Sequence, residues 1–213
     1  LILSLFLILS LGISHGALDH LKGIKLLKIL KYDSIYMFYF FYILLALIVI
    51  FSWIILPKFL LLLFLIVASY HFGKEDSEFI KLNSKVDIIY FFKGSLIITA
   101  PLLFHKSETL KIFMDLNFDV SNSFFVFNEF IYFLVGLSFL SNIIISQDKD
   151  INIKALLLMD FISVLLLNFF LQPILAFTIY FCFLHSIRHS FKLSNELNTK
   201  DFIKGIKKFI IKA

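Results

Sequence analysis

Residues 35–56 decide the fold class: they read IYMFYFFYILLALIVIFSWIIL, a run without a single charged side chain. A helix needs about 20 mostly apolar residues to cross the hydrocarbon core of a bilayer. Similar apolar runs recur along the chain and predict about seven spans. The predicted spans are Leu1–Ser14 (in part), Ile35–Leu56, Phe59–His71, Ile88–Phe104, Phe124–Ile145, Ala155–Leu171 and Ile174–His189. We therefore expect an all-α fold, a polytopic transmembrane helical bundle.

The composition supports a membrane protein. Hydrophobic residues make up 60% of the chain and charged residues only 16%, whereas a soluble domain is about half apolar and about a quarter charged. The net charge of +5 comes from lysines between and after the apolar runs. It therefore argues against nucleic-acid binding and for orientation in the lipid bilayer. The single cysteine, Cys182, excludes a disulfide framework and a cysteine-based metal site.

The distribution of lysines predicts the orientation. Lysines follow the first, third and last spans, whereas the opposite links carry few cations. By the positive-inside rule the lysine-rich side is cytoplasmic, and every odd-numbered span ends there. No linker or repeat interrupts the pattern, so we expect one integral-membrane domain over residues 1–213 in the cell (inner) membrane. The chain begins inside an apolar run, and we interpret it as clipped at its N-terminus.

Five of the six histidines lie in three short motifs, each at the end of an apolar run. The motifs are Ile13-Ser14-His15-Gly16-Ala17-Leu18-Asp19-His20, Ser69-Tyr70-His71-Phe72-Gly73-Lys74-Glu75-Asp76 and Phe183-Leu184-His185-Ser186-Ile187-Arg188-His189. They end the first, third and seventh spans, so the predicted topology places them all at the cytoplasmic end. His105 falls at the opposite end. Imidazole is rarely buried in lipid without a partner, and three clusters at one depth indicate a shared metal site.

Helical spacing indicates which side chains share a face. His185 and His189 are four residues apart, which places both rings within reach of one ion. In the other two motifs a carboxylate follows a histidine at the same spacing and could fix its tautomer: Asp19 after His15, and Glu75 after His71. His20 is five residues from the first motif histidine, so only one of these two faces the site. Hydrogen-bonded interfacial residues remain the alternative explanation.

A site of imidazoles without thiolate suits Fe(II), Zn or Cu. A catalytic metal must keep coordination positions open for dioxygen, water or substrate. The spans otherwise contain few polar residues, which indicates a substrate as apolar as the lipid. Aromatic residues near the histidines are candidates to line a substrate tunnel: Tyr70, Phe72, Tyr180 and Phe183.

The three motifs resemble the signatures of the Brp/Blh family of bacterial and archaeal membrane β-carotene 15,15′-dioxygenases, which are encountered alongside retinal-binding rhodopsins. The resemblance runs from the first motif to the last and covers most of the chain. It implies cleavage of β-carotene by dioxygen at the central double bond on non-haem Fe(2+), with the product retinal passed to a microbial rhodopsin. It also implies the iron ligands His15, His71, His185 and His189, with His20 as second choice.

Two features depart from the family pattern. Ser14 stands where members commonly have proline before the first motif histidine. The chain also ends in a lysine-rich tail, whereas members usually continue through further apolar spans. A clipped C-terminus is therefore a second expectation. If the missing helices wall the substrate tunnel, the chain would bind metal without turning over.

Two other classes remain open. A membrane di-iron desaturase or hydroxylase uses more histidines, in H-x-x-x-H and H-x-x-H-H boxes, than the six found here. A non-enzymatic metal transporter or haem-binding protein should carry polar residues or broken helices near the membrane midplane. Predicted spans two, five and six contain few such residues beyond Ser52, Ser138 and Asn168. Metal analysis separates the classes by one iron per chain, two irons, or haem absorption.

Overall fold

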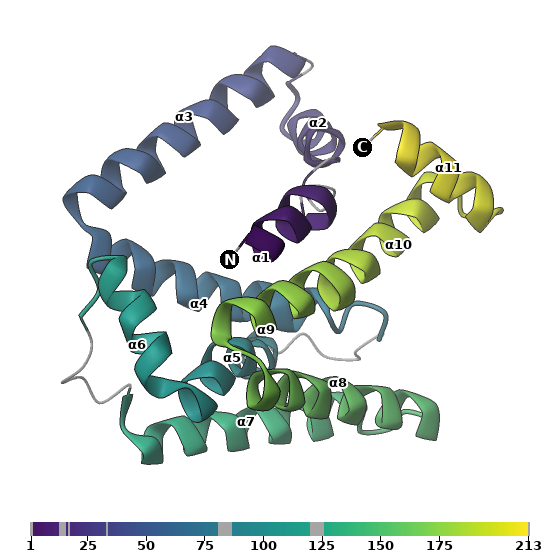
Figure 1. Cartoon of the computed structure of the whole chain (residues 1–213). Helices are drawn as coiled ribbons and strands as arrows, with labels where there is room; N and C mark the ends of the chain where they lie inside the picture. The colour runs from purple at the N-terminus through teal and green to yellow at the C-terminus, as the bar shows by residue number, and fades with distance from the viewer. Residues whose placement is uncertain are drawn as a thin grey trace. The chain divides into compact units, whose positions relative to one another are not determined.

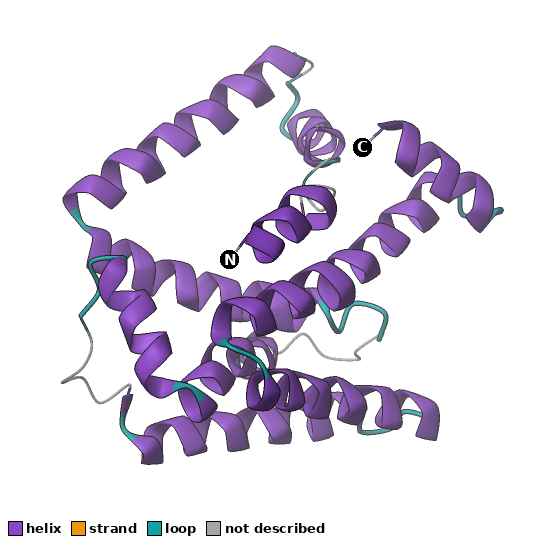
Figure 2. Cartoon of the chain, viewed as in Figure 1, coloured by secondary structure: helices purple, strands orange, loops and turns teal. Residues whose placement is uncertain are grey.

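The computed structural model describes residues 2–12, 16, 18–32, 34–80, 87–119 and 126–212, without the side chains of Leu21 and Lys212. The described residues form helices joined by short turns, and no strand occurs among them (Figure 2). The helical segments are α1 (Ile2–Leu7), η1 (Ile8–Gly12), α2 (Asp19–Ile29), α3 (Ile35–Ile55), α4 (Pro57–Glu75), α5 (Asp87–Phe104), α6 (Lys106–Asp115), α7 (Asn128–Ser146), α8 (Ile151–Phe170), α9 (Pro173–Ile179), η4 (Tyr180–His185), α10 (Ser186–Leu197) and α11 (Phe202–Lys212).

Among the described residues, six helices are long and apolar enough to cross a membrane. They are α3, α4, α5, α7, α8 and the continuous helix Pro173–Leu197, which comprises α9, η4 and α10. The segment Ile2–Gly12 adds a shorter apolar helix. The all-α membrane fold is therefore confirmed, and the described part of the chain contains six helices of spanning length beside this short helix.

The ends of the spans differ from the prediction in physically simple ways. The predicted span Phe59–His71 is part of a longer helix, because Pro57 occupies the first turn of α4, where its missing N–H does not break a hydrogen bond. The last span continues past His189 to Leu197. The prediction ended it where the apolar run ends, but the polar residues of α10 continue the same helix. The predicted start of one span at Phe124 lies outside the described residues.

The chain divides into two compact units. The first unit is Pro57–Tyr180, and the second comprises Ile2–Leu56 and Phe181–Ala213. In the first unit α5 is central, because it contacts α4, α6, α7 and α8 (Figure 1). A small core of Ile80, Ile145 and Leu157 joins the segment after α4 to α7 and α8.

Two glycines let α4 and α5 touch backbone to backbone. A Cβ atom added to Gly73 would overlap the carbonyl oxygen of Tyr90, and one added to Gly94 would overlap that of Ser69. Small residues at such crossings are a common way for membrane helices to pack, because close approach maximises van der Waals contact. The crossing fixes the end of α4 that carries His71 against α5.

The second unit has its own contacts. Gly23 of α2 lies directly against the ring of Phe38 of α3, and Gly205 of α11 lies against the Ser194 carbonyl of α10. A core cluster of Leu18, Leu193 and Phe209 joins the segment before α2 to α10 and α11. The lysine-bearing helices of this unit are thus held together by apolar packing.

Candidate metal centre

The C-terminal end of α4 carries one predicted metal ligand, His71, and its predicted carboxylate partner, Glu75. Residues Phe59–Ala68 of α4 are apolar, and polar side chains accumulate only after them. His71 and Glu75 lie one helical turn apart in this polar end, the spacing at which two side chains share a face. Both are partly exposed, and the His71 ring lies 5.7 Å from that of Phe72. The end of α4 therefore presents an imidazole and a carboxylate on one face.

The helix Pro173–Leu197 carries two more predicted metal ligands, His185 and His189. It changes from α-helix to a π-helical turn at Tyr180–His185 and returns to α-helix at Ser186. His185 and His189, one turn apart, are only 1% and 5% exposed. The rings of Phe181 and His185 stack with centroids 5.8 Å apart. π-helical turns are rare and often occur at functional sites, and this one delivers two buried imidazoles to one face of a helix.

A buried polar network joins the end of α4 to Tyr180 within the first unit. The Tyr180 hydroxyl donates to Oδ2 of Asp76 at 2.5 Å. Lys93 of α5 donates to the Ser77 hydroxyl at 2.7 Å and to the Asp76 carbonyl at 3.2 Å. On the other side, the Ser138 hydroxyl of α7 donates to the Lys93 carbonyl at 3.1 Å. The network thus links α4, α5, α7 and Tyr180.

Lys93 is the residue of this network that sequence reasoning missed. It is a lysine inside a membrane-spanning helix, yet only 7% of it is exposed. An ionisable residue within a span is costly and is usually functional or paired. The signal was visible in the sequence as one lysine in the run Ile88–Phe104. Asp76 was visible as part of the second motif, but its partner Tyr180 lies 104 residues away along the chain.

The remaining predicted ligands lie elsewhere. His15 lies outside the described residues. Asp19 and His20 are the first two residues of α2 in the second unit, and both are partly buried. His105 lies between α5 and α6, beyond the C-terminal end of α5, with its Nδ1 atom 3.9 Å from Glu108. His105 comes twelve residues after Lys93, which lies in the N-terminal half of α5, so most of α5 separates His105 from the polar network.

The aromatic residues predicted to line a tunnel have distinct environments. Tyr70 donates to Asp87 at 2.9 Å and accepts from Lys74 at 2.7 Å at an exposed position. Phe72 is buried against the rings of Phe177 and Tyr180. Phe183 is exposed. Tyr180 therefore has a hydrogen-bonding role beside its ring packing.

An apolar cavity of about 400 Å³ lies among α4, α5 and α7 in the first unit. Its lining includes Ile66, Ser69, Ile98 and Phe130. The Ser69 hydroxyl donates to the Leu65 carbonyl of its own helix, so it is already satisfied. Ser69 and His71 are two residues apart and, at about 100° per residue, point to nearly opposite faces of α4. The cavity is therefore separate from the histidine-bearing face of α4.

The donor set fits a metal ion of the predicted class. Two buried imidazoles one turn apart and an imidazole–carboxylate pair one turn apart are nitrogen and oxygen ligands without thiolate. Such ligands suit Fe(II), Zn or Cu. Buried imidazoles on a membrane-spanning helix also match the rule that polar groups there mark a functional site.

Comparisons with known proteins point to one family. A family model described as "Beta-carotene 15,15'-dioxygenase" matches residues 6–213. A protein called "Beta-carotene 15,15'-dioxygenase" from an uncultured marine bacterium, 66A03, is 28% identical over 197 residues, or 87% of this chain. The match covers 66% of that relative, so the chain spans just under two thirds of its length. No solved structure matches.

Proposed function

Because the chain belongs to the β-carotene 15,15′-dioxygenase family, we propose that it cleaves the central double bond of β-carotene with dioxygen to give two molecules of retinal. The reaction breaks one C=C bond, and each of the two carbons takes one oxygen atom, so no further oxidant or reductant is needed. The single observation that carries the proposal is the pair of buried imidazoles, His185 and His189, one turn apart on the helix Pro173–Leu197, which is apolar enough to span a membrane. An apolar membrane protein also matches an apolar substrate.

We assign the metal ligands by the motifs of the sequence. His15, His71, His185 and His189 would hold Fe(2+), with His20 as second choice. Bound Fe(2+) would supply the activation of dioxygen. Glu75 lies one turn after His71 and would accept its second ring N–H, with Asp19 in the same role for His15. The apolar spans would exclude water from the site. The lysine distribution supports a site on the cytoplasmic side of the cell membrane, and a microbial rhodopsin would receive the retinal.

We further infer that Asp76 and Tyr180 are positioning residues for this site. Asp76 is the residue after Glu75, and Tyr180 begins the π-helical turn that ends at His185. The hydrogen bond between them therefore fixes the end of α4 relative to the start of that turn. Lys93 of α5 contacts the same region, because its ammonium group donates a hydrogen bond to the hydroxyl of Ser77, just after α4. Groups that orient metal ligands in this way typically contribute about 10–100-fold to metal affinity or activity.

Replacing Tyr180 by phenylalanine tests this role. The change removes one hydroxyl and keeps the ring that packs against Phe72. We expect iron affinity to fall about tenfold and the visible spectrum of the Co(II)-substituted protein to change, while the chain still accumulates in the membrane. Iron titration of the metal-free protein and Co(II) absorption spectroscopy measure these effects.

Tyr70→Phe is the matched control. Tyr70 is the neighbour of His71 in sequence, and its hydroxyl also donates to an aspartate, Asp87, but at an exposed position. We expect wild-type iron affinity and a wild-type Co(II) spectrum for this variant. Equal effects of Tyr180→Phe and Tyr70→Phe, or no effect of either, would contradict the positioning role while leaving the proposed reaction open.

Expression in bacteria that accumulate β-carotene tests the reaction itself. We expect the orange colour to bleach and retinal to appear, because central cleavage of the symmetrical substrate gives a single product. Chromatography of the extracted pigments and metal analysis of the purified protein, with one iron per chain, are the measurements. Persisting colour in iron-loaded protein would count against the substrate, apocarotenals of unequal length would indicate cleavage at another bond, and two irons or haem would indicate the alternative classes.

A further inference from the structure

The second unit carries a surface that combines lysines with exposed apolar side chains. We define this basic surface as α2, α11 and the face of α10 that packs against them. Three lysines lie on α2, which has one acidic residue, and α11 has lysines without any acidic residue. Large apolar side chains on the same helices are exposed, among them Ile29 and, at 83%, Ile211. Helices with this mixture of lysine and exposed isoleucine typically lie in the membrane interface.

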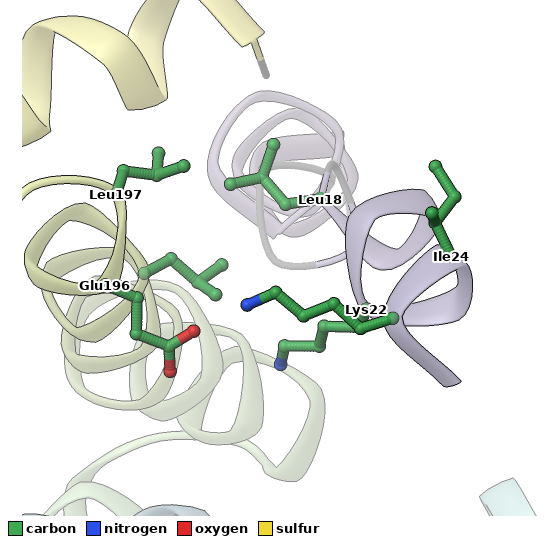
Figure 3. Close-up of a pocket in the computed structure, with 7 residues that line it drawn as sticks. Leu18, Lys22, Ile24, Glu196 and Leu197 are labelled. Atoms are coloured by element: carbon green, nitrogen blue, oxygen red, sulfur yellow. The ribbon is translucent and has the colours of Figure 1, made fainter. Parts of the chain in front are cut away.

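A cavity of about 240 Å³ opens in the basic surface between α2 and α10. Its walls are apolar side chains, and its polar groups are two ammonium groups and one carboxylate (Figure 3). The lining residues are Leu18, Lys22, Ile24, Lys25, Leu193, Glu196 and Leu197. In Figure 3 the lysine side chains extend from α2 across the cavity toward α10, which carries Glu196. The cavity is therefore amphipathic, with an apolar wall beside a charged one.

Positive charge exceeds negative charge at this cavity. Glu196 is the one acidic residue that lines it, and its Oε1 atom already lies 3.9 Å from the ammonium group of Lys192 on the same helix. Lys22 and Lys25 thus add two positive charges to a carboxylate that has a cation of its own. An anionic group placed between these lysines would be stabilised by both.

Asp201, the acidic residue just before α11, is also paired with a lysine. The backbone N–H of Lys204 donates to Asp201 at 3.1 Å, and the Lys204 ammonium group lies 3.2 Å from the same carboxylate. These two interactions lower the pKa of Asp201, so it stays ionised and paired with Lys204. Lys207 and Lys208 remain on a helix that has no carboxylate of its own.

Apolar packing sets the orientation of α11. Phe209 is buried in the cluster with Leu18 and Leu193, and Gly205 lies against the Ser194 carbonyl. Ile210 and Ile211, which follow Phe209, are exposed. The helix is therefore anchored to α10 by one residue of its apolar side, while neighbouring isoleucines remain available for lipid.

We propose that the basic surface binds anionic phospholipids, with a headgroup phosphate between Lys22 and Lys25 and an acyl chain along Leu193 and Leu197. The charge excess selects an anionic headgroup, and the apolar wall selects a ligand that carries a hydrocarbon chain. The described part of the chain also contains six helices long and apolar enough to span a membrane, so phospholipid surrounds the protein that carries this surface. Basic pockets of membrane proteins on the cytoplasmic side bind anionic lipids in this manner.

Lipid titration of the purified, delipidated chain tests the proposal. Native mass spectrometry would count bound dioctanoyl-phosphatidylglycerol and dioctanoyl-phosphatidylcholine over a range of lipid concentrations. We expect phosphatidylglycerol to bind at least tenfold more tightly, and Lys22→Gln and Lys25→Gln each to weaken it about fivefold. High salt should reduce the preference, because both lysines are exposed and their field is screened.

A double substitution in the first unit provides the control. Lys58→Gln with Lys111→Gln removes the same charge as Lys22→Gln with Lys25→Gln, but from exposed positions of α4 and α6. This control should keep the wild-type preference for phosphatidylglycerol. Equal binding of the two lipids, equal losses in both double variants, or equally tight binding of octanoate would overturn the proposal. None of these outcomes depends on iron or on carotenoid cleavage.

Discussion

Alanine in place of His185 or His189 is expected to abolish retinal formation and to lower the iron content of the purified protein. Both imidazoles are buried on one face of a spanning helix, and loss of one ligand weakens metal binding and opens an additional coordination position. His15→Ala and His71→Ala should have the same effect. Retinal yield and iron per chain, compared at matched protein level, are the measurements.

Three further variants make this test specific to the site. His105→Ala should be close to neutral, because His105 lies beyond the C-terminal end of α5. His20→Ala should be intermediate, and Glu75→Ala should cost about 10–100-fold in iron affinity or activity if Glu75 orients His71. Full activity in His71→Ala or His185→Ala would overturn the site as assigned, as would a loss in His105→Ala equal to theirs.

Replacing Gly94 by alanine is expected to prevent stable folding of the first unit. The new methyl group would overlap the Ser69 carbonyl oxygen and lie 2.5 Å from the Gly73 nitrogen. Both atoms belong to the backbone, so no rotation of a side chain relieves the overlap. We expect a loss of stability of at least about 3 kcal/mol, the upper end for overpacking, and Gly73→Ala should act in the same way. Thermal unfolding in detergent and the level of protein in the membrane measure the effect.

Gly136→Ala is the matched control for this prediction. Gly136 lies in α7, another spanning helix of the same unit, and an added Cβ would meet nothing within 4 Å. The substitution also improves helix propensity, because glycine is about 1 kcal/mol less favourable than alanine within a helix. Stability of Gly94→Ala equal to that of Gly136→Ala would show that α4 and α5 do not cross at these glycines.

The all-α membrane fold was predictable because uncharged runs such as Ile35–Leu56 leave few other structures in a bilayer. Family membership was predictable too, since three ordered histidine motifs carry more information than any one of them, and the family match over residues 6–213 confirms it. The spacing of His185 and His189 on one helix also followed from the sequence alone.

Other features depended on information that local patterns lack. The π-helical turn at Tyr180–His185 has no signature in hydrophobic periodicity, which assumes a regular helix. The bond between Asp76 and Tyr180 joins residues 104 positions apart. Lys93 could have been noticed as a charge within an apolar run, but its acceptors at the end of α4 become evident only when the two helices cross.

The burial of Lys93 also constrains how the protein is made. A lysine within a single helix opposes transfer from the translocon into lipid by about 2.5–3.5 kcal/mol at the bilayer centre. Its acceptors, the Ser77 hydroxyl and the Asp76 carbonyl, belong to the segment synthesised just before α5. We therefore expect α4 to wait at the translocon until α5 emerges, so that the two helices partition into the bilayer together as a preassembled hairpin.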